Sequence, residues 1–177
     1  MRSTPASPPS GIEPPGNPLT TFCAMTEWTT SVSRDIAAAP EALYDLVADI
    51  TRMGEWSPEN HTCSWKDGFD SPVVGAEWNG DNRNGEFEWQ TEGRVTEAER
   101  GKVFAFDAKV GDFVFAKWAY EFEAIDGGTR VTEHTLDLRP DSVKERSFEL
   151  TGIEDRGEEN RKNMEATLAA LAAAAEG

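Results

Sequence analysis

Two charged side chains interrupt strand faces that are otherwise apolar. Arg34 shares the two-residue period of Val32 and Ile36, and Glu133 has the same parity as Val131. We therefore expect both side chains to point inward, where an unpaired charge is costly. Each needs a partner, either a charged side chain that serves only the fold or a polar group of a ligand. Glu133 with a raised pKa is also a candidate acid or base.

Three further side chains are candidates for contacting a ligand or moving a proton. Asn160 and Met164 lie on one stripe at helical spacing. The Asn160 amide could bind a ligand, although we favour a bond to a backbone group. His61 follows the EWSPEN segment, near the expected cavity mouth, and a single loop histidine is more often a surface residue than a catalyst. His134 has the opposite parity to Glu133 and is expected to face solvent.

The sequence contains no recognisable nucleophile or cofactor motif. There is no GxSxG segment, phosphate-binding loop or dinucleotide fingerprint. The two cysteines and two histidines show no metal-ligand spacing, so we expect no metal and no cofactor. Cys63 has no basic neighbour in sequence to lower its pKa, and we expect it to be packed rather than reactive.

Large rings lie on the same apolar strand faces, and the chain is 10% aromatic. Any one of these rings would ordinarily be core, but a set this large, with a few polar groups among it, is typical of a ligand pocket. Trp56, in the EWSPEN segment, is expected to be structural. The rings of the inward set are Trp78, Trp89, Phe104, Phe106, Trp118, Tyr120 and Phe122.

The elements that would position these groups follow from periodicity and turn residues. Pro40 and the spacing after it predict a helix over 40–50, followed by a short helical turn within 51–60. The Asn- and Gly-rich segment 81–85 is expected to turn. A weak helical stretch over 141–150 precedes a break at Gly152 and a long amphipathic helix to 175, whose charged face would include Arg156. Alternation predicts strands over 27–38, 61–66, 76–80, 87–95, 103–110, 115–125 and 129–138. This order indicates an α+β fold.

Several segments carry a family resemblance that spans about residues 27–171. They read APEALYDLVADI, EWSPEN, VGAEWNGDNRNGEFEW, GGTRVTE and LTGIEDRGEENRKNMEATLAAL. The chain resembles the polyketide cyclase/dehydrase and lipid-transport family of the START-like (SRPBCC, helix-grip) superfamily. The resemblance implies a curved seven-stranded antiparallel sheet around the long C-terminal helix, two short helices between the first two strands, and an apolar cavity. It also implies that the first and last strands pair, which would make Arg34 and Glu133 neighbours.

These observations favour a binding or carrier protein for a small hydrophobic molecule, such as a lipid, a polyketide or another polycyclic compound. One alternative is a polyketide cyclase or dehydratase that uses the same cavity, with Glu133 or His61 moving a proton. Another is an interaction domain with a filled cavity and no ligand. The residues expected to line the cavity are Arg34, Trp78, Trp89, Phe104, Phe106, Trp118, Tyr120, Glu133, Asn160 and Met164.

Charge and hydropathy limit the possible partners and place of action. Lys and Arg number 17 against 33 Asp and Glu, for a net charge of −16. Such a chain repels nucleic acid and anionic membranes. No apolar run approaches the roughly 20 residues needed to span a bilayer, and no secretory signal precedes the first strand, so a cytoplasmic protein without integral membrane association is expected.

The first 24 residues differ from the remainder in composition. They hold six of the ten prolines and are expected to form a disordered tail. A single domain would then cover 25–177, and translation could begin at Met1 or at Met25. The sequence leaves open whether this domain is a monomer or a homodimer.

Overall fold

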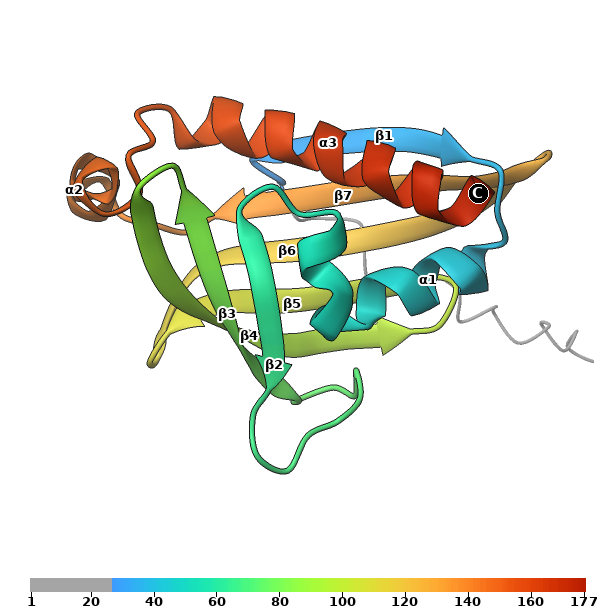
Figure 1. Ribbon diagram of the computed structural model, residues 1–177, viewed down its shortest axis with the longest axis horizontal. Coiled ribbons are helices and arrows are strands. Elements are labelled where there is room, and N and C mark those ends of the chain that lie inside the picture. The colour runs from blue at the N-terminus through green and yellow to red at the C-terminus, as the bar shows by residue number, and fades with distance from the viewer. Residues whose placement is uncertain (1–26) are drawn as a thin grey trace, which may run out of the picture.

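The computed structural model describes residues 27–177 (Figure 1), so the expectations for residues 1–24 and for a start at Met25 lie outside the described part. The N-terminal half contains β1 (Thr30–Ile36), α1 (Pro40–Ala48), the 3₁₀ helix η1 (Ile50–Glu55), β2 (Asn60–Trp65) and β3 (Glu77–Asn84). The remainder contains β4 (Phe87–Glu99), β5 (Val103–Val110), β6 (Phe113–Ile125), β7 (Gly128–Asp137), α2 (Asp141–Thr151) and α3 (Arg156–Glu176).

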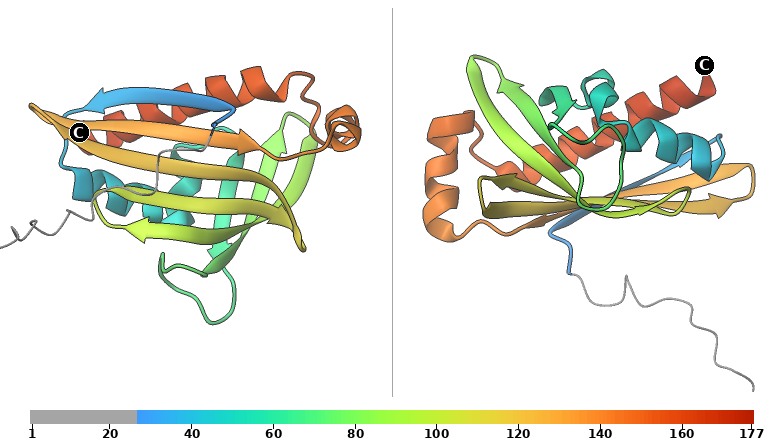
Figure 2. Two further views of the ribbon diagram at one scale, coloured as in Figure 1. Left: turned by 180° about the vertical axis from the view of Figure 1, so that it is seen from behind. Right: turned by 90° about the horizontal axis from the view of Figure 1, so that it is seen from below.

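The seven strands form one antiparallel sheet in the order β1-β7-β6-β5-β4-β3-β2. The sheet is curved, and α1 and α3 lie on the same side of it (Figure 2). Alternating strands with one charged face must bury the other, and the long helix covers it. The predicted α+β helix-grip architecture, with two short helices between the first two strands, is confirmed.

The core lies between the sheet and the apolar stripes of α1 and α3. Leu168 and Leu171 are fully buried on α3, as their spacing predicts. Asp155 caps this helix, because its carboxylate accepts a hydrogen bond of 3.0 Å from the Glu158 backbone N–H. On α1, Tyr44 contacts the rings of Phe104 and Phe122 edge-on, at centroid distances of 6.2 and 5.9 Å. These ring contacts pack α1 against the sheet.

The strand β3 is longer than its sequence predicts. The expected turn over 81–85 is wrong, because β3 continues to Asn84 and the chain reverses at Gly85, where φ is 58°. The polar residues remain in the sheet because they bond across to β4. Asp81 accepts a hydrogen bond of 2.8 Å from Gln90, and the Asn82 amide donates one of 3.0 Å to Thr91. The hydrogen bonds to β4 therefore stabilise an extended conformation at residues whose local preference is for a turn.

Gly152 separates α2 from α3, as predicted. Its φ of 68° is left-handed, and its N–H bonds to the Phe148 carbonyl at 2.8 Å. Across residues 27–177, none of the helices has both the length and the apolar character needed to cross a membrane.

Candidate functional site

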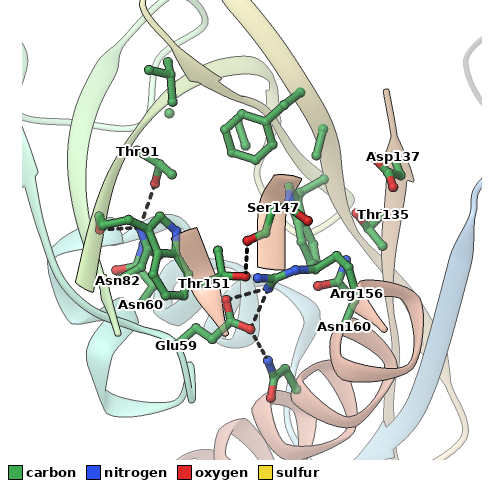
Figure 3. A pocket seen from close by; sticks show the side chains of 18 of the residues that line it. Glu59, Asn60, Asn82, Thr91, Thr135, Asp137, Ser147, Thr151, Arg156 and Asn160 are labelled. Carbon is green, nitrogen blue, oxygen red and sulfur yellow. Dashed lines mark hydrogen bonds and ion pairs between the residues drawn. The ribbon is translucent and has the colours of Figure 1, made fainter. Parts of the chain in front are cut away.

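A cavity of about 850 Å³ lies between the concave face of the sheet, α2 and the first half of α3 (Figure 3). Pockets that hold small molecules have volumes of roughly 300–1,000 Å³. The filled interior that an interaction domain without a ligand would require is therefore not found. The site is built mainly by inward side chains of β3 to β7, with the loop after η1 at one side.

Most of the residues predicted to line the cavity do so. The lining includes Trp78, Trp89, Phe106, Trp118, Tyr120, Glu133, Asn160 and Met164. Phe104 does not line it, because this ring is fully buried against Tyr44 and Phe106. Strand parity therefore selects the correct face but does not distinguish cavity from packed core. Whether the lining residues bind a ligand remains a prediction.

One aromatic wall depends on a glycine. The Trp78 ring lies directly over Gly93, its register partner on β4, and a Cβ at Gly93 would fall 2.0 Å from Trp78 Cε2. The indole also meets Phe106 and Trp65 edge-on, at centroid distances of 5.0 and 5.8 Å. Any larger residue at position 93 would displace Trp78 from the wall.

The predicted proximity of Arg34 and Glu133 is wrong. The β1–β7 register places Arg34 opposite Val131, and Val32 opposite Glu133. Arg34 is exposed and lies outside the cavity lining, because β1 is an edge strand and its long side chain reaches solvent.

Glu133 instead pairs with a tyrosine. The Tyr120 hydroxyl donates a hydrogen bond of 2.7 Å to Glu133 Oε1, and Glu133 is only 3% exposed. Burial raises the pKa of Glu133 to about 7, although the bond from Tyr120 acts in the opposite direction. Burial, reinforced by the neighbouring Glu133, raises the pKa of Tyr120 well above its usual value. The carboxyl is therefore able to hold or release a proton near neutral pH.

Two buried oxygen atoms, one of them in this pair, have no hydrogen-bond partner among the described residues. They are Glu133 Oε2 and Thr135 Oγ1, both on the inward face of β7. Thr135 is 1% exposed and lines the cavity beside Asp137 (Figure 3). Buried polar atoms are rarely left unpaired in folded proteins, and these two belong to residues that line the cavity.

A charged network forms another part of the lining, near the start of α3 (Figure 3). Arg156 Nη1 donates to both carboxylate oxygens of Glu59, at 2.7 and 2.8 Å, and the Asn163 amide donates to Glu59 Oε1 at 2.8 Å. The Arg156 guanidinium also lies 5.9 Å from the Trp89 ring centre. The prediction that Arg156 belongs to the outward face of the helix is wrong.

The sequence did contain a signal for this network. Arg156, Asn160, Asn163 and Thr167 recur at helical spacing, as a polar stripe beside Met164. Glu59 lies in the EWSPEN segment, and only the tertiary structure shows that this loop reaches α3.

Asn160 does not make the backbone bond that we favoured. Its side chain lines the cavity, and no hydrogen bond joins its amide to another described residue. The amide is thus available to a ligand from α3, on the opposite side of the cavity from the sheet.

A second ion pair joins the end of β7 to α2. Arg139 donates from Nε and Nη2 to the two oxygens of Asp137, at 2.9 and 2.8 Å, and from Nη1 to Ser147 Oγ at 3.1 Å. Burial raises the pKa of Asp137, but the hydrogen bonds from Arg139 outweigh this effect and the net pKa is lowered. Arg139 therefore holds α2 over the cavity.

Neither histidine lies at the cavity. His61 is exposed on β2 and is not part of the lining. The prediction that His134 faces solvent is wrong, because it is only 8% exposed. Its ring stacks on Trp28 at 5.0 Å between centroids, and Nδ1 lies 2.7 Å from Ser31 Oγ. Burial lowers the pKa of His134, partly offset by Glu121. Parity correctly placed it on the outer face, but Trp28 covers that position.

Cys63 and Trp56 are both buried, as expected. Burial raises the pKa of the Cys63 thiol to about 12, which keeps it protonated and unreactive. Within residues 27–177, no three His, Cys, Asp or Glu side chains cluster in a way that would hold a metal ion.

Comparison with known proteins identifies the family. Residues 27–176 match the family described as polyketide cyclase / dehydrase and lipid transport. The chain belongs to this family. Among curated proteins, none matches the sequence.

Three solved structures illustrate the likeness. Protein CV1439 from Chromobacterium violaceum is 16% identical, with a TM-score of 0.64 over 84% of this chain and 97% of that one. The di-domain ARO/CYC StfQ from the steffimycin biosynthetic pathway is 14% identical, with a TM-score of 0.64 over 83% of this chain and 50% of that one. The Polyketide_cyc-like protein Cgl2372 from Corynebacterium glutamicum is 33% identical over 86% of this chain and 88% of that one, with a TM-score of 0.45. The first two likenesses concern the fold alone.

Proposed function

We propose that this chain binds a small hydrophobic molecule, such as a lipid, a polyketide or another polycyclic compound, in the cavity beneath α3. The observation that carries the proposal is a cavity of about 850 Å³ whose lining combines aromatic rings with polar side chains. This combination gives a ligand apolar contact area together with a means of orientation. The family to which the chain belongs supports the same function.

The polar groups are placed to orient such a molecule. Glu133 and Thr135 lie on the sheet side, and Asn160 lies across the cavity on α3. Arg34 and His61 have no part in this proposal, because both are exposed outside the lining.

Titration with a neutral apolar dye, such as N-phenyl-1-naphthylamine, tests the proposal. We expect saturable binding by the wild-type protein and its loss in Ala108→Trp, which fills the cavity from β5. Ala173→Trp, at an exposed position of α3, is the matched control and should bind normally. Folded wild-type protein that binds no dye, or binding that is unchanged by Ala108→Trp, would contradict the proposal.

A cyclase or dehydratase that uses the same cavity is the second candidate, and the Glu133–Tyr120 pair favours it. A buried carboxyl with a pKa of about 7 can accept a proton from carbon next to a carbonyl and return it to a departing hydroxyl. The ARO/CYC protein StfQ shares the fold. Turnover of a poly-β-ketone thioester that falls at least about 100-fold in Glu133→Gln would support this role. Turnover that persists in that variant would exclude Glu133 from the mechanism.

A further inference from the structure

Two unpaired buried oxygens on one face of β7 distinguish this part of the cavity from its apolar walls. Glu133 Oε2 and Thr135 Oγ1 belong to residues that are 3% and 1% exposed, and both residues line the cavity. They are two positions apart on the strand, so they project side by side about 6.6 Å apart at the backbone. Both side chains therefore lie on the same face of β7.

The existing hydrogen bond decides what Glu133 can offer. Tyr120 donates to Oε1, so in the neutral acid the proton resides on Oε2, which has no acceptor among the described residues. The Thr135 hydroxyl likewise has a proton to donate and no acceptor. A single ligand atom that accepts from both donors needs two lone pairs and no hydrogen of its own, and a carbonyl oxygen meets this requirement.

We propose that Glu133 and Thr135 form a subsite for a carbonyl oxygen of the bound molecule, each donating one hydrogen bond to it. The inference rests on the proposed function, since it names the polar group by which the hydrophobic ligand is oriented. The neighbouring walls are flat rings, among them Trp118 and Phe106, so the class of ligand that fits is an aromatic or polycyclic ketone.

A matched set of rigid probes tests the subsite. Fluorenone, fluorene and 9-fluorenol share one ring system and differ only in a carbonyl, a methylene and a hydroxyl group. Calorimetric titration near pH 6, below the Glu133 pKa of about 7, gives a Kd for each. The ratio of the fluorene Kd to the fluorenone Kd measures the preference for the carbonyl, and fluorene binding alone reports whether the cavity is intact.

Removing one donor should reduce that ratio by about fivefold, because one hydrogen bond is worth about 1 kcal/mol. Thr135→Val removes the hydroxyl at constant shape. Tyr120→Phe with Glu133→Met removes the other donor together with its partner, so that no polar atom is left unpaired. Glu133→Gln should retain the preference, because its amide N–H can still donate. Thr132→Val, on the opposite face of the same strand, is the control and should leave the ratio unchanged.

The infrared stretch of the fluorenone carbonyl provides a direct readout. Hydrogen bonding should lower its frequency in the wild-type complex, and Thr135→Val should reverse part of the shift. A ratio and a frequency that Thr135→Val leaves unchanged, or tighter binding of 9-fluorenol than of fluorenone, would overturn the subsite while fluorene still binds. Failure of all three probes to bind folded protein would instead contradict the proposed function, and the subsite with it.

Discussion

Glu133 shows how much one side chain depends on its neighbours. Its inward direction follows from strand parity, but its chemistry follows from burial and from Tyr120, whose hydroxyl is 2.7 Å away. An ion pair with Arg34 would have fixed the carboxylate as a charged structural group. The neutral partner instead leaves a proton that can be transferred or shared with a ligand near pH 7.

The raised pKa of Glu133 makes the stability of the protein depend on pH. The unfolded carboxyl loses its proton near 4.5 and the folded one near 7, so the folded state binds the proton more tightly between these values. This contribution is fully present below about pH 4.5 and is lost as the pH rises to about 7, by about 3 kcal/mol. The free energy of unfolding of Glu133→Gln, relative to wild type, should therefore rise by about 3 kcal/mol between pH 4.5 and pH 8.

Urea denaturation across this pH range measures the free energy of unfolding of Glu133→Gln and of wild type. Subtracting one from the other cancels the contribution of all other carboxyls, because both proteins contain them. Glu123→Gln, at an exposed position of β6, controls for the amide substitution. A difference between Glu133→Gln and wild type that stays constant with pH would show that Glu133 is not buried as a neutral acid.

Among the elements around the site, α2 is attached by few buried apolar contacts, and the Asn84 amide of β3 donates a hydrogen bond of 2.9 Å to its Thr151 carbonyl. Val143, Phe148 and Leu150 are exposed on it, so this helix buries little apolar surface. Its polar attachment to β7 is the bond from Arg139 to Ser147, and Arg139 is itself held by Asp137. Elements with few buried contacts open most readily, so we expect α2 to open more readily than the sheet.

Arg139→Ala should loosen α2 without unfolding the sheet. We expect amides of residues 141–151 to exchange with deuterium roughly tenfold faster, because a hydrogen bond to a charged group is worth about 1.5 kcal/mol. Arg130→Ala removes a similar bidentate pair, with Asp35 on the outer face, and should leave α2 unchanged. If the amides of α2 exchange equally slowly in both variants, packing rather than Arg139 holds the helix.

The molecule as a whole carries its −16 charge in residues 27–177, since Arg2 and Glu13 cancel in the preceding segment. Charged side chains cover the outer face of the sheet, while aromatic rings lie on the sheet side of the cavity. Some of the charges are paired, as in the cluster of Lys66 and Lys109 with Glu77 and Glu92. The excess of carboxylates nevertheless repels itself and disfavours the compact state.

Salt should therefore stabilise this protein at neutral pH. Raising NaCl from about 10 to about 150 mM shortens the screening length from roughly 30 to 8 Å, and the free energy of unfolding should increase by on the order of 1 kcal/mol. Urea denaturation at both salt concentrations measures the effect. Near the isoelectric point of about 4.4 the stabilisation should disappear, because the net charge does. Stability that falls with salt at neutral pH would show that the ion pairs outweigh the repulsion.

Periodicity in the sequence was sufficient to predict the antiparallel sheet, the covering helix and the face to which each ring belongs. These properties are local, because a period of 2 or 3.6 residues is set by neighbours along the chain. The same parity predicted correctly that Trp78, Tyr120 and Glu133 point inward.

Only the tertiary structure decided which inward residues meet. The strand register places Glu133 next to Tyr120, which donates a hydrogen bond to it, and not next to Arg34. Arg34 lies in solvent because β1 is an edge strand. The loop before β2 places Glu59 beside Arg156, and the hydrogen bonds between them direct the arginine side chain toward the cavity. Periodicity specifies the direction of a side chain but not its depth or its partner, because depth and partner depend on residues up to about a hundred positions away.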